Sequence, residues 1–428
     1  MTHSLRLGSA YADATRIAPT RPAAVQTYVA VNPVLRMALY LFVLSIPFEM
    51  PRRTIPIEIP TVAAVILLAT TVLNPSAAFR RIPRAALWFA AHVWVLVLAW
   101  IVLSNEHTAL TTRHVLSLAM LVMVLWVIYN LLADPRVLRG MLLAIVLSCS
   151  IRAGMQWLGI GATSYEVWTG GERVTLFGQN ANLSAIILSA GLVMVLGLRT
   201  TRARWLPRLD LVSWPLAAMI GVAVIQTGSR GGLLCVAGGM LVFFLNGRTL
   251  ARRLLNVGVG VAAISILAWG AMQSEMMRGR ILESTEGGKF AGREQIYPAT
   301  FEMIAERPLL GWGPIDNQYE IARRMQYQRA PRRDAHNLVL ELLTTSGVVG
   351  TIPFLVGLAL CLRAAWRARR GLLGVLPLAV LVAVLLGTIT GTWIASKILW
   401  VTLAFALAAD AHWSTPVPPQ SSLAGGRL

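Results

Sequence analysis

The sequence predicts an all-α polytopic membrane protein, and its composition and the spacing of its apolar segments are the observations that predict it. Of the 428 residues, 56% are hydrophobic and only 13% are charged, and the mean hydropathy is +0.64. An ordinary soluble domain carries about 25% charged residues, so a soluble enzyme is a poor match. Apolar segments that could cross roughly 30 Å of hydrocarbon recur along the chain, and we count about 12 of them.

We expect the transmembrane helices where these apolar segments occur. The first, second, seventh and eighth segments are short for a helix that crosses a bilayer. The expected spans are 34–46, 60–73, 85–102, 115–132, 138–158, 181–198, 211–225, 231–245, 254–272, 337–362, 372–389 and 393–409.

Clusters of arginine in every second connection predict the orientation. Because short cytoplasmic loops are rich in Arg and Lys, we expect these connections and both chain ends in the cytoplasm. The arginines that carry the pattern are Arg80, Arg81, Arg84, Arg136, Arg139, Arg199, Arg202, Arg204, Arg208, Arg248, Arg252, Arg253, Arg363, Arg367, Arg369 and Arg370. The predicted order is a cytoplasmic N-terminal segment (1–33), transmembrane helices 1–9 (34–272), a large outer loop (273–335), transmembrane helices 10–12 (336–412) and a cytoplasmic disordered tail (413–428).

The formal net charge of +19 follows largely from this topology. Nucleic-acid binding is the usual first interpretation of so basic a chain, but it needs charges that form one groove or face. Here the charges are dispersed between apolar segments. We therefore predict no nucleic-acid partner.

The long outer connection at 273–335 is predicted to have structure of its own. Its stretch GREQIYPATFEMIAERPLLGWGP predicts a helix that ends at Arg307, because Pro308 cannot continue it, followed by a tight turn around Gly311 and Gly313. Long loops in compact proteins are commonly functional when they are ordered.

Three arginines stand on the outer side, where short connections should be poor in positive charge. Arg173 lies in the stretch GERVTLFGQNAN, Arg230 lies in TGSRGG, and Arg293 begins the predicted helix of the long loop. Structural alternatives stay open: a simple turn around Arg173, a cation reaching out from a helix end for Arg230, and an ion pair with Glu294 for Arg293. If the three converge, their bidentate hydrogen bonding suits a phosphate group.

His336 stands where a polar cluster meets an apolar helix, in RRDAHNLVLELLTTSG. We expect Asp334 to cap a helix that begins near Ala335, which would put His336 in the first helical turn. The positive end of the helix and the nearby arginines would favour a neutral imidazole, which can act as a base. A structural role for His336 is the alternative.

The helix that follows His336 is too long to lie within the bilayer as one straight element. At about 1.5 Å per residue, a helix over 337–362 would be roughly 39 Å long, which exceeds the hydrocarbon core. Either His336 stands above the bilayer or the chain bends at Gly347 and Gly350. In both cases His336 faces water and an outer cavity.

The sequence predicts neither a metal site nor a cofactor. The outer segments contain no His-x-x-x-His or Asp-x-Asp spacing, and Glu49 and Glu58 are too isolated to count as a metal site. Arginines and one neutral base at a membrane surface fit the transfer of a sugar from a lipid pyrophosphate. In that reaction the arginines stabilise the charge that develops on the leaving group, and the base removes a proton from the attacking hydroxyl.

Four motifs, in chain order, carry a resemblance to a known family. GERVTLFGQNAN, TGSRGG, GREQIYPATFEMIAERPLLGWGP and AHNLVLELLTTSGVVG resemble the O-antigen ligase and polymerase-like superfamily of bacterial envelope glycosyltransferases. The resemblance covers residues 170–350. It implies a type C glycosyltransferase-like fold, with 273–335 as the large, partly helical periplasmic loop, and a metal-independent, inverting transfer. It also implies that Arg230, Arg293 and, less directly, Arg173 bind the donor, and that His336 is catalytic.

The function that the resemblance implies is that of an O-antigen ligase in the inner membrane of a Gram-negative bacterium. It would transfer O-antigen polysaccharide en bloc from undecaprenyl pyrophosphate to a sugar hydroxyl of lipid A-core, on the periplasmic side. An O-antigen polymerase or a protein O-oligosaccharyltransferase would use a similar donor. A lipid or sugar transporter is the non-enzyme alternative, although its usual mark, ionisable residues near the bilayer midplane, is weak in this chain.

Overall fold

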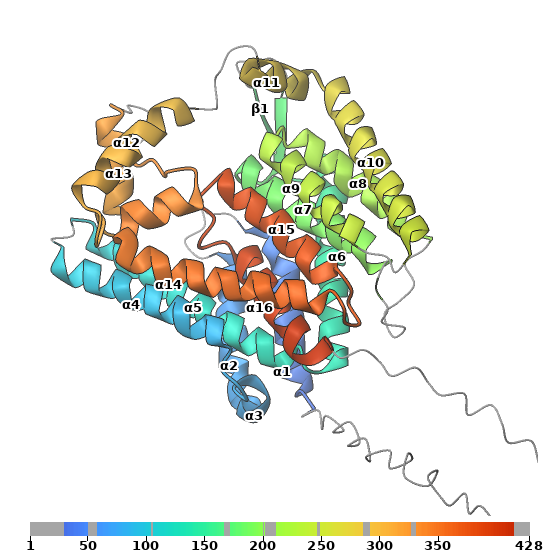
Figure 1. Ribbon diagram of the computed structural model, residues 1–428, viewed down its shortest axis with the longest axis horizontal. Helices are drawn as coiled ribbons and strands as arrows, with labels where there is room; N and C mark the ends of the chain where they lie inside the picture. The colour runs from blue at the N-terminus through green and yellow to red at the C-terminus, as the bar shows by residue number, and fades with distance from the viewer. Residues whose placement is uncertain are drawn as a thin grey trace, which may run out of the picture.

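The computed structural model describes most of the chain and supports an all-α membrane protein (Figure 1). The described residues are 30–49, 58–103, 106–166, 172–199, 201, 211–245, 249–285, 292–326 and 331–414. The predicted terminal segments 1–33 and 413–428 lie almost entirely outside these ranges.

Each of the twelve segments predicted to be apolar helices overlaps a helix of the structure. These helices are α1 (Pro33–Ser45), α2 (Ile59–Thr70), α4 (Arg84–Val102), α5 (Thr108–Leu131), α6 (Pro135–Trp157), α7 (Ala181–Leu198), α8 (Ser213–Gln226), α9 (Arg230–Val242), α10 (Leu250–Gln273), α14 (Leu338–Ala368), α15 (Leu376–Ile389) and α16 (Lys397–Trp413). Within the described residues, α4, α5, α6, α7 and α14 are long and apolar enough to cross a membrane. The count of about 12 spans and the predicted orientation stay predictions.

The remaining elements lie between these helices or in the long loop. They are the 3-10 turns η1 (Ile46–Phe48), η2 (Thr71–Leu73) and η3 (Phe243–Leu245), the helices α3 (Pro75–Ala78), α11 (Glu275–Thr285), α12 (Arg293–Glu306) and α13 (Asp316–Arg324), and the strands β1 (Ala162–Glu166) and β2 (Glu172–Leu176). The strands form an antiparallel hairpin in which Ala162 pairs with Leu176. The sequence analysis had left a simple turn around Arg173 open and had predicted no strands here.

The helices surround α7, whose side chains are buried along nearly its whole length. It packs against α8, α9 and α15, while α14 packs against α4 and α16 (Figure 1). Apolar side chains also cover the outside. Trp94 and Ile101 on α4, and Ile266 and Trp269 on α10, each expose about two thirds or more of their surface. Such an apolar exterior fits contact with lipid tails.

Helix α14 bends at Gly347, which is one of the two alternatives that its length left open. Gly347 has φ 59° and ψ −165°, a backbone conformation that glycine adopts easily. The bend releases backbone groups from the helix, and the turn after α12 satisfies them: the amide of Trp312 donates to the carbonyl of Thr344 (2.8 Å), and that of Val348 donates to the carbonyl of Pro308 (2.8 Å). The long loop is therefore fastened to the bend of α14.

The start of α14 differs from the prediction. The helix begins at Leu338 and not near Ala335, and its cap is Asn337, whose side chain accepts a hydrogen bond from the amide of Val339 (2.9 Å). His336 therefore precedes the helix, with a positive φ of 51°. Asp334 accepts a hydrogen bond from the amide of His336 (3.1 Å), but no helix begins there, so the cap of α14 is Asn337 and not Asp334.

Candidate active site

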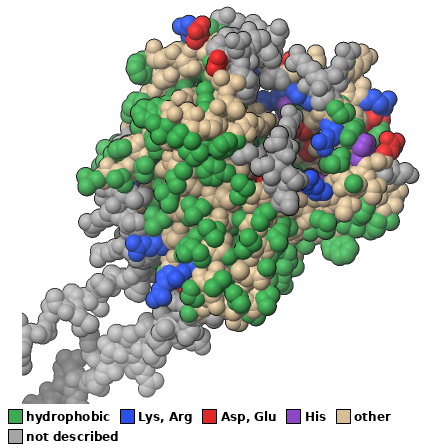
Figure 2. Space-filling model, turned by 180° about the vertical axis from the view of Figure 1, so that it is seen from behind, with side chains coloured by type: hydrophobic (Ala, Val, Ile, Leu, Met, Phe, Trp, Pro, Cys, Tyr) green, Lys and Arg blue, Asp and Glu red, His purple; other side chains and the backbone are tan. Residues whose placement is uncertain are grey.

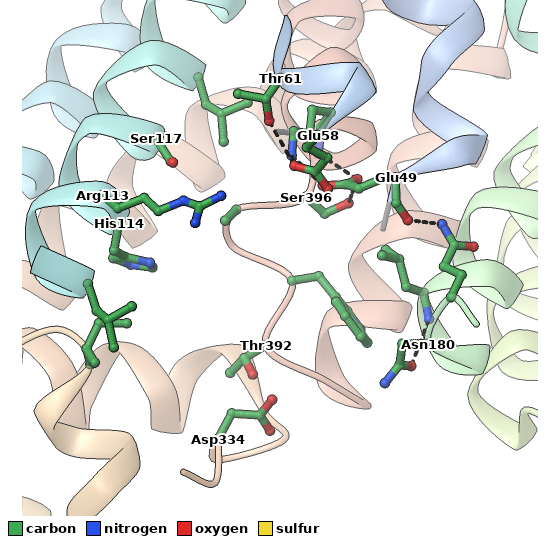
Figure 3. A pocket seen from close by; sticks show the side chains of 18 of the residues that line it. Glu49, Glu58, Thr61, Arg113, His114, Ser117, Asn180, Asp334, Thr392 and Ser396 are labelled. Carbon is green, nitrogen blue, oxygen red and sulfur yellow. Dashed lines mark hydrogen bonds and ion pairs between the residues drawn. The ribbon is translucent and has the colours of Figure 1, made fainter. Parts of the chain in front are cut away.

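A cavity of about 710 Å³ opens between six segments that come from different parts of the sequence (Figure 3). Its walls come from Glu49 and the start of α2, α5, the start of α7, the residue before α13, the residues before α14, and the α15–α16 connection. Its polar and charged lining residues are Glu49, Glu58, Thr61, Arg113, His114, Ser117, Gln179, Asn180, Arg332, Asp334, Thr392, Ser396 and Lys397. On the face opposite to that of Figure 1, described charged residues and histidines gather around a hollow, and hydrophobic side chains cover much of the rest (Figure 2).

Asp334 connects His336 to this cavity. The Nδ1 atom of His336 pairs with Oδ1 of Asp334, and the hydroxyl of Thr392 donates to the same carboxylate. Burial of Asp334 acts to raise its pKa, but the hydrogen bonds from His336 and Thr392 and the charge of the imidazole hold that pKa below its ordinary value. The carboxylate of Asp334 therefore stays a hydrogen-bond acceptor. It pairs with Nδ1 of His336, so Nε2 is the ring nitrogen that does not face Asp334.

Arg293 contacts the same connecting segment as Asp334. It begins α12, and its guanidinium donates to the carbonyl of Thr390 (3.1 Å). Its Nε–H is buried and has no hydrogen-bond partner among the described residues, which is uncommon for a polar group inside a protein. The α15–α16 connection therefore holds Arg293 through Thr390 and the Asp334–His336 pair through Thr392.

Arg230 approaches this segment from the start of α9. A Cβ atom added to Gly231 would lie 2.6 Å from the hydroxyl of Thr390, so glycine lets the backbone of α9 come this close to the side chain of Thr390. The guanidinium of Arg230 donates to the carbonyl of Arg280 (2.7 Å) on α11. The structure thus brings Arg230, Arg293 and His336 around one connection.

Arg173 lies on β2 and holds the turn in front of α9. Its Nε–H donates to the carbonyl of Thr227 (2.7 Å), and a terminal N–H donates to Oδ1 of Asn182 (3.3 Å). The hydroxyl of Ser229, the cap of α9, donates to the same Asn182 oxygen (2.9 Å). These contacts make Arg173 a support for the turn that carries Arg230.

Glu49 and Glu58 are not isolated, contrary to the sequence interpretation. Both accept hydrogen bonds from Nζ of Lys397, at 2.8 Å to Glu49 and 2.6 Å to Glu58. The three side chains expose less than a tenth of their surface. Burial raises the pKa of Glu49, although the charge of Lys397 opposes that shift. The partners lie about 340 positions apart in the chain, so no local pattern could have predicted their contact.

Arg113 and His114 are further cavity residues that the sequence interpretation did not use. Both project from the second turn of α5, and Figure 3 shows them pointing from that helix into the cavity. The stretch TTRHVL gave a signal, because an arginine and a histidine stand together at the start of an apolar helix. That signal was weaker than the signal from the arginines that stand beside glycines.

A second aspartate–histidine pair lies on another side of the long loop. Nδ1 of His107, just before α5, lies 2.6 Å from Oδ1 of Asp316 at the start of α13. The ring of His107 stacks on that of Tyr319, with 3.6 Å between ring centroids and 12° between planes. His107 thus ties the α4–α5 connection to α13.

The described residues contain no group of three or more His, Cys, Asp or Glu side chains that could hold a metal ion. The two buried carboxylates that do meet, Glu49 and Glu58, share the ammonium group of Lys397. Their oxygens are therefore directed at a cation that the chain itself provides.

Comparison with known families gives one match. Residues 214–355 match a family model described as O-antigen ligase. The resemblance that the four motifs carry is therefore confirmed over about a third of the chain. That stretch contains Arg230, Arg293 and His336, whereas Arg173 precedes it. No curated protein matches the chain.

Proposed function

We propose, from the match of residues 214–355 to the O-antigen ligase family, that this protein is a glycosyltransferase of the inner membrane that uses a lipid-linked donor. It transfers O-antigen polysaccharide en bloc from undecaprenyl pyrophosphate to a sugar hydroxyl of lipid A-core, on the periplasmic side. The observation that carries the proposal is the convergence of Arg230, Arg293 and the Asp334–His336 pair, all within that stretch, on the α15–α16 connection.

In the proposed reaction, His336 acts on the acceptor. Its Nε2 atom accepts the proton of the acceptor hydroxyl while that oxygen forms a bond to the anomeric carbon of the donor sugar. Asp334 is a positioning residue, because its carboxylate holds Nδ1–H and so keeps the lone pair on Nε2. A single displacement of this kind inverts the anomeric configuration.

The leaving group is undecaprenyl pyrophosphate, which takes the electron pair of the broken bond between carbon and oxygen. Arg293 and Arg230 stabilise the negative charge that develops there. The buried, unpartnered Nε–H of Arg293 supports this role, since it can donate to a phosphate oxygen. Arg173 was predicted to bind the donor as well. Its contacts with Thr227 and Asn182 favour an indirect contribution, through the position of Arg230.

The proposal is tested with purified protein in lipid nanodiscs, given undecaprenyl pyrophosphate-linked polysaccharide and lipid A-core. We expect long glycan on lipid A-core, with release of undecaprenyl pyrophosphate and without any ion gradient. Lengthening of the lipid-linked glycan in place of transfer to lipid A-core would identify a polymerase. Gradient-dependent movement of lipid or sugar with no new glycosidic bond would identify a transporter and overturn the proposal.

The same question can be put in cells. Lipopolysaccharide from cells that lack the protein should run on a gel as core alone, while long glycan accumulates on its lipid carrier. Core that bears a single repeat would instead indicate a missing polymerase.

A further inference from the structure

Two arginines of the cavity are left over once its other charged groups have been paired. Lys397 is shared by Glu49 and Glu58, and Asp334 is paired with His336. Arg113 and Arg332 also line the cavity, and no hydrogen bond or ion pair joins either of them to another described residue. A guanidinium is always charged, so both arginines keep N–H donors for a bound anion, while the carboxylates of Glu49, Glu58 and Asp334 balance the charge of the described lining as a whole.

The positions of these arginines direct them at one region. Arg113 comes from α5 and Arg332 from the segment just before α14, so two different segments bring them to the cavity. Figure 3 shows the guanidinium of Arg113 extending from α5 into the open middle of the cavity, with Thr392 and Asp334 on another side of that space. Asp334 is the residue that holds His336. An anion bound in this cavity would therefore share it with Asp334, the partner of the proposed base.

The rest of the lining defines the kind of molecule that carries this anion. Leu110, Met120, Leu121, Leu183 and Trp393 give the cavity an apolar side, while Ser117 and Asn180 add neutral polar groups. Pockets of several hundred Å³ with an apolar wall and a few convergent polar groups suit a single bound ligand. The combination fits an amphipathic molecule with a phosphate group, and arginine is the side chain best suited to phosphate because it donates bidentately.

We propose that Arg113 and Arg332 form a phosphate-binding subsite for a phosphorylated glycolipid substrate, separate from the arginines Arg230 and Arg293. This inference rests on the proposed transferase function. The phosphate is either the pyrophosphate of the lipid-linked donor or a phosphate on the core sugars of the acceptor.

The test compares KM values for the two substrates in the nanodisc assay. The variants are Arg113→Gln, Arg332→Gln and Arg113→Lys, with Arg139→Ala as the matched control, because Arg139 is an exposed arginine of α6 outside the cavity. A hydrogen bond to a charged group is worth about 1.5–3 kcal/mol, so each glutamine variant should raise one KM roughly 10- to 100-fold. Arg113→Lys should recover part of the loss, and Arg139→Ala should behave as wild type.

The two sources of phosphate give different results. If the subsite binds the donor, its KM rises and undecaprenyl pyrophosphate without glycan becomes a weaker inhibitor by the same factor. If it binds the acceptor, only the acceptor KM rises, and enzymatic removal of the core phosphates abolishes the difference between variant and wild type. Unchanged KM values for both substrates in correctly folded Arg113→Gln and Arg332→Gln proteins would overturn the subsite.

Failure of the subsite and failure of the proposed function are distinguishable. Wild-type protein that transfers glycan, with variants indistinguishable from it, leaves the function intact and removes only the subsite. Wild-type protein that transfers nothing, in a preparation that binds the donor, refutes the function first. Folding of each variant is checked by its elution from gel filtration and by its thermal unfolding, so a general loss of structure is not mistaken for a change in KM.

Discussion

The two aspartate–histidine pairs of this protein, His336 with Asp334 and His107 with Asp316, look alike in their polar contact but differ in their surroundings. In both, Nδ1 of the imidazole faces a carboxylate oxygen. His107 is also covered on one ring face by Tyr319, and its aspartate lies 209 positions away in the chain. His336 and Asp334 are two positions apart, just before a helix, and no stacked aromatic ring contacts His336 within the described residues.

This difference teaches that a carboxylate partner alone does not identify a base. A stacked ring bonded to a distant segment holds two parts of the fold together, as His107 does for the α4–α5 connection and α13. A base needs a nitrogen that substrate can reach. His107 and Asp316 themselves line a cavity of about 860 Å³, whereas Asp334, and not His336, is the member of the other pair that lines the cavity of Arg113 and Arg332. The two pairs differ instead in their ring contacts and in the family match, which covers both Asp334 and His336 but not His107.

Removal of each histidine should separate the pairs most strongly. Truncation of a general base commonly lowers the rate about 10²- to 10⁴-fold, so His336→Ala should abolish measurable transfer while the protein stays folded. His107→Ala should keep the rate within about tenfold of wild type and lower thermal stability instead, because it loses only a tether. The measurement is the initial rate at saturating donor and acceptor, with the melting temperature of each variant beside it. A normal rate in His336→Ala would remove that residue from the mechanism.

The next largest effect is expected at the buried cluster of Glu49, Glu58 and Lys397, which lines the same cavity as Asp334. Breaking a buried ion pair costs about 3–5 kcal/mol, because the remaining charges are left without a partner. Lys397→Met should therefore strongly destabilise the protein, and the second change Glu49→Gln should restore part of the stability by removing one carboxylate. Thermal unfolding in nanodiscs measures both. Equal stability of Lys397→Met and wild type would mean that the cluster does not hold the α15–α16 connection.

Much of the helical layout could be predicted from the sequence, because apolar segments of membrane length are a local signal. The bend at Gly347 was one of the two alternatives that the length of α14 left open. The start of α14 could not be predicted, because Asp334 and Asn337 are both good capping residues and their difference lies in backbone conformation. The contact of Lys397 with Glu49 and Glu58 joins the two ends of the chain, and only the folded structure brings them together.

The candidate site was predictable in part for the same reason. Arg230 and Arg293 stand beside glycines or at a helix start, which are features of short sequence windows. That Arg293 and Gly231, the neighbour of Arg230, both approach Thr390 depends on the packing of α9, α12 and α15, which one sequence does not contain. Arg113 was overlooked because it stands within a helix, where a basic residue is easily taken for an interfacial anchor.

Asp334 offers a finer test of the His336 pair. In Asp334→Asn the amide can present its N–H to Nδ1, which favours the tautomer with the proton on Nε2, the wrong one for a base. We expect kcat to fall about 10²-fold or more with little change in either KM. The matched variant Asp316→Asn at the other pair should leave kcat nearly unchanged. If the two variants lowered kcat equally, the two pairs could not be assigned different roles.

The smallest effect concerns the response of the long loop to pH. Arg323 and Arg324 both bond Glu320, and the hydrogen bond from Arg323 is the main cause of a lowered pKa at that carboxyl, against the opposing effect of burial. A carboxyl with a lowered pKa stabilises the fold above its ordinary pKa of about 4.3, and the contribution disappears as the pH falls through the lower folded value. The rate of limited proteolysis in the α12–α13 region should thus be constant from about pH 7.5 to 5. It should increase only below about pH 4, where the carboxylates of these ion pairs become protonated. Because partly exposed ion pairs contribute little, Glu320→Gln should remove the increase in proteolysis with only a small loss of stability at neutral pH.

An increase in proteolysis already at about pH 6, in the range where histidine titrates, would place the control of this loop at the His107–Asp316 pair. His107→Ala would then be the variant that abolishes the increase.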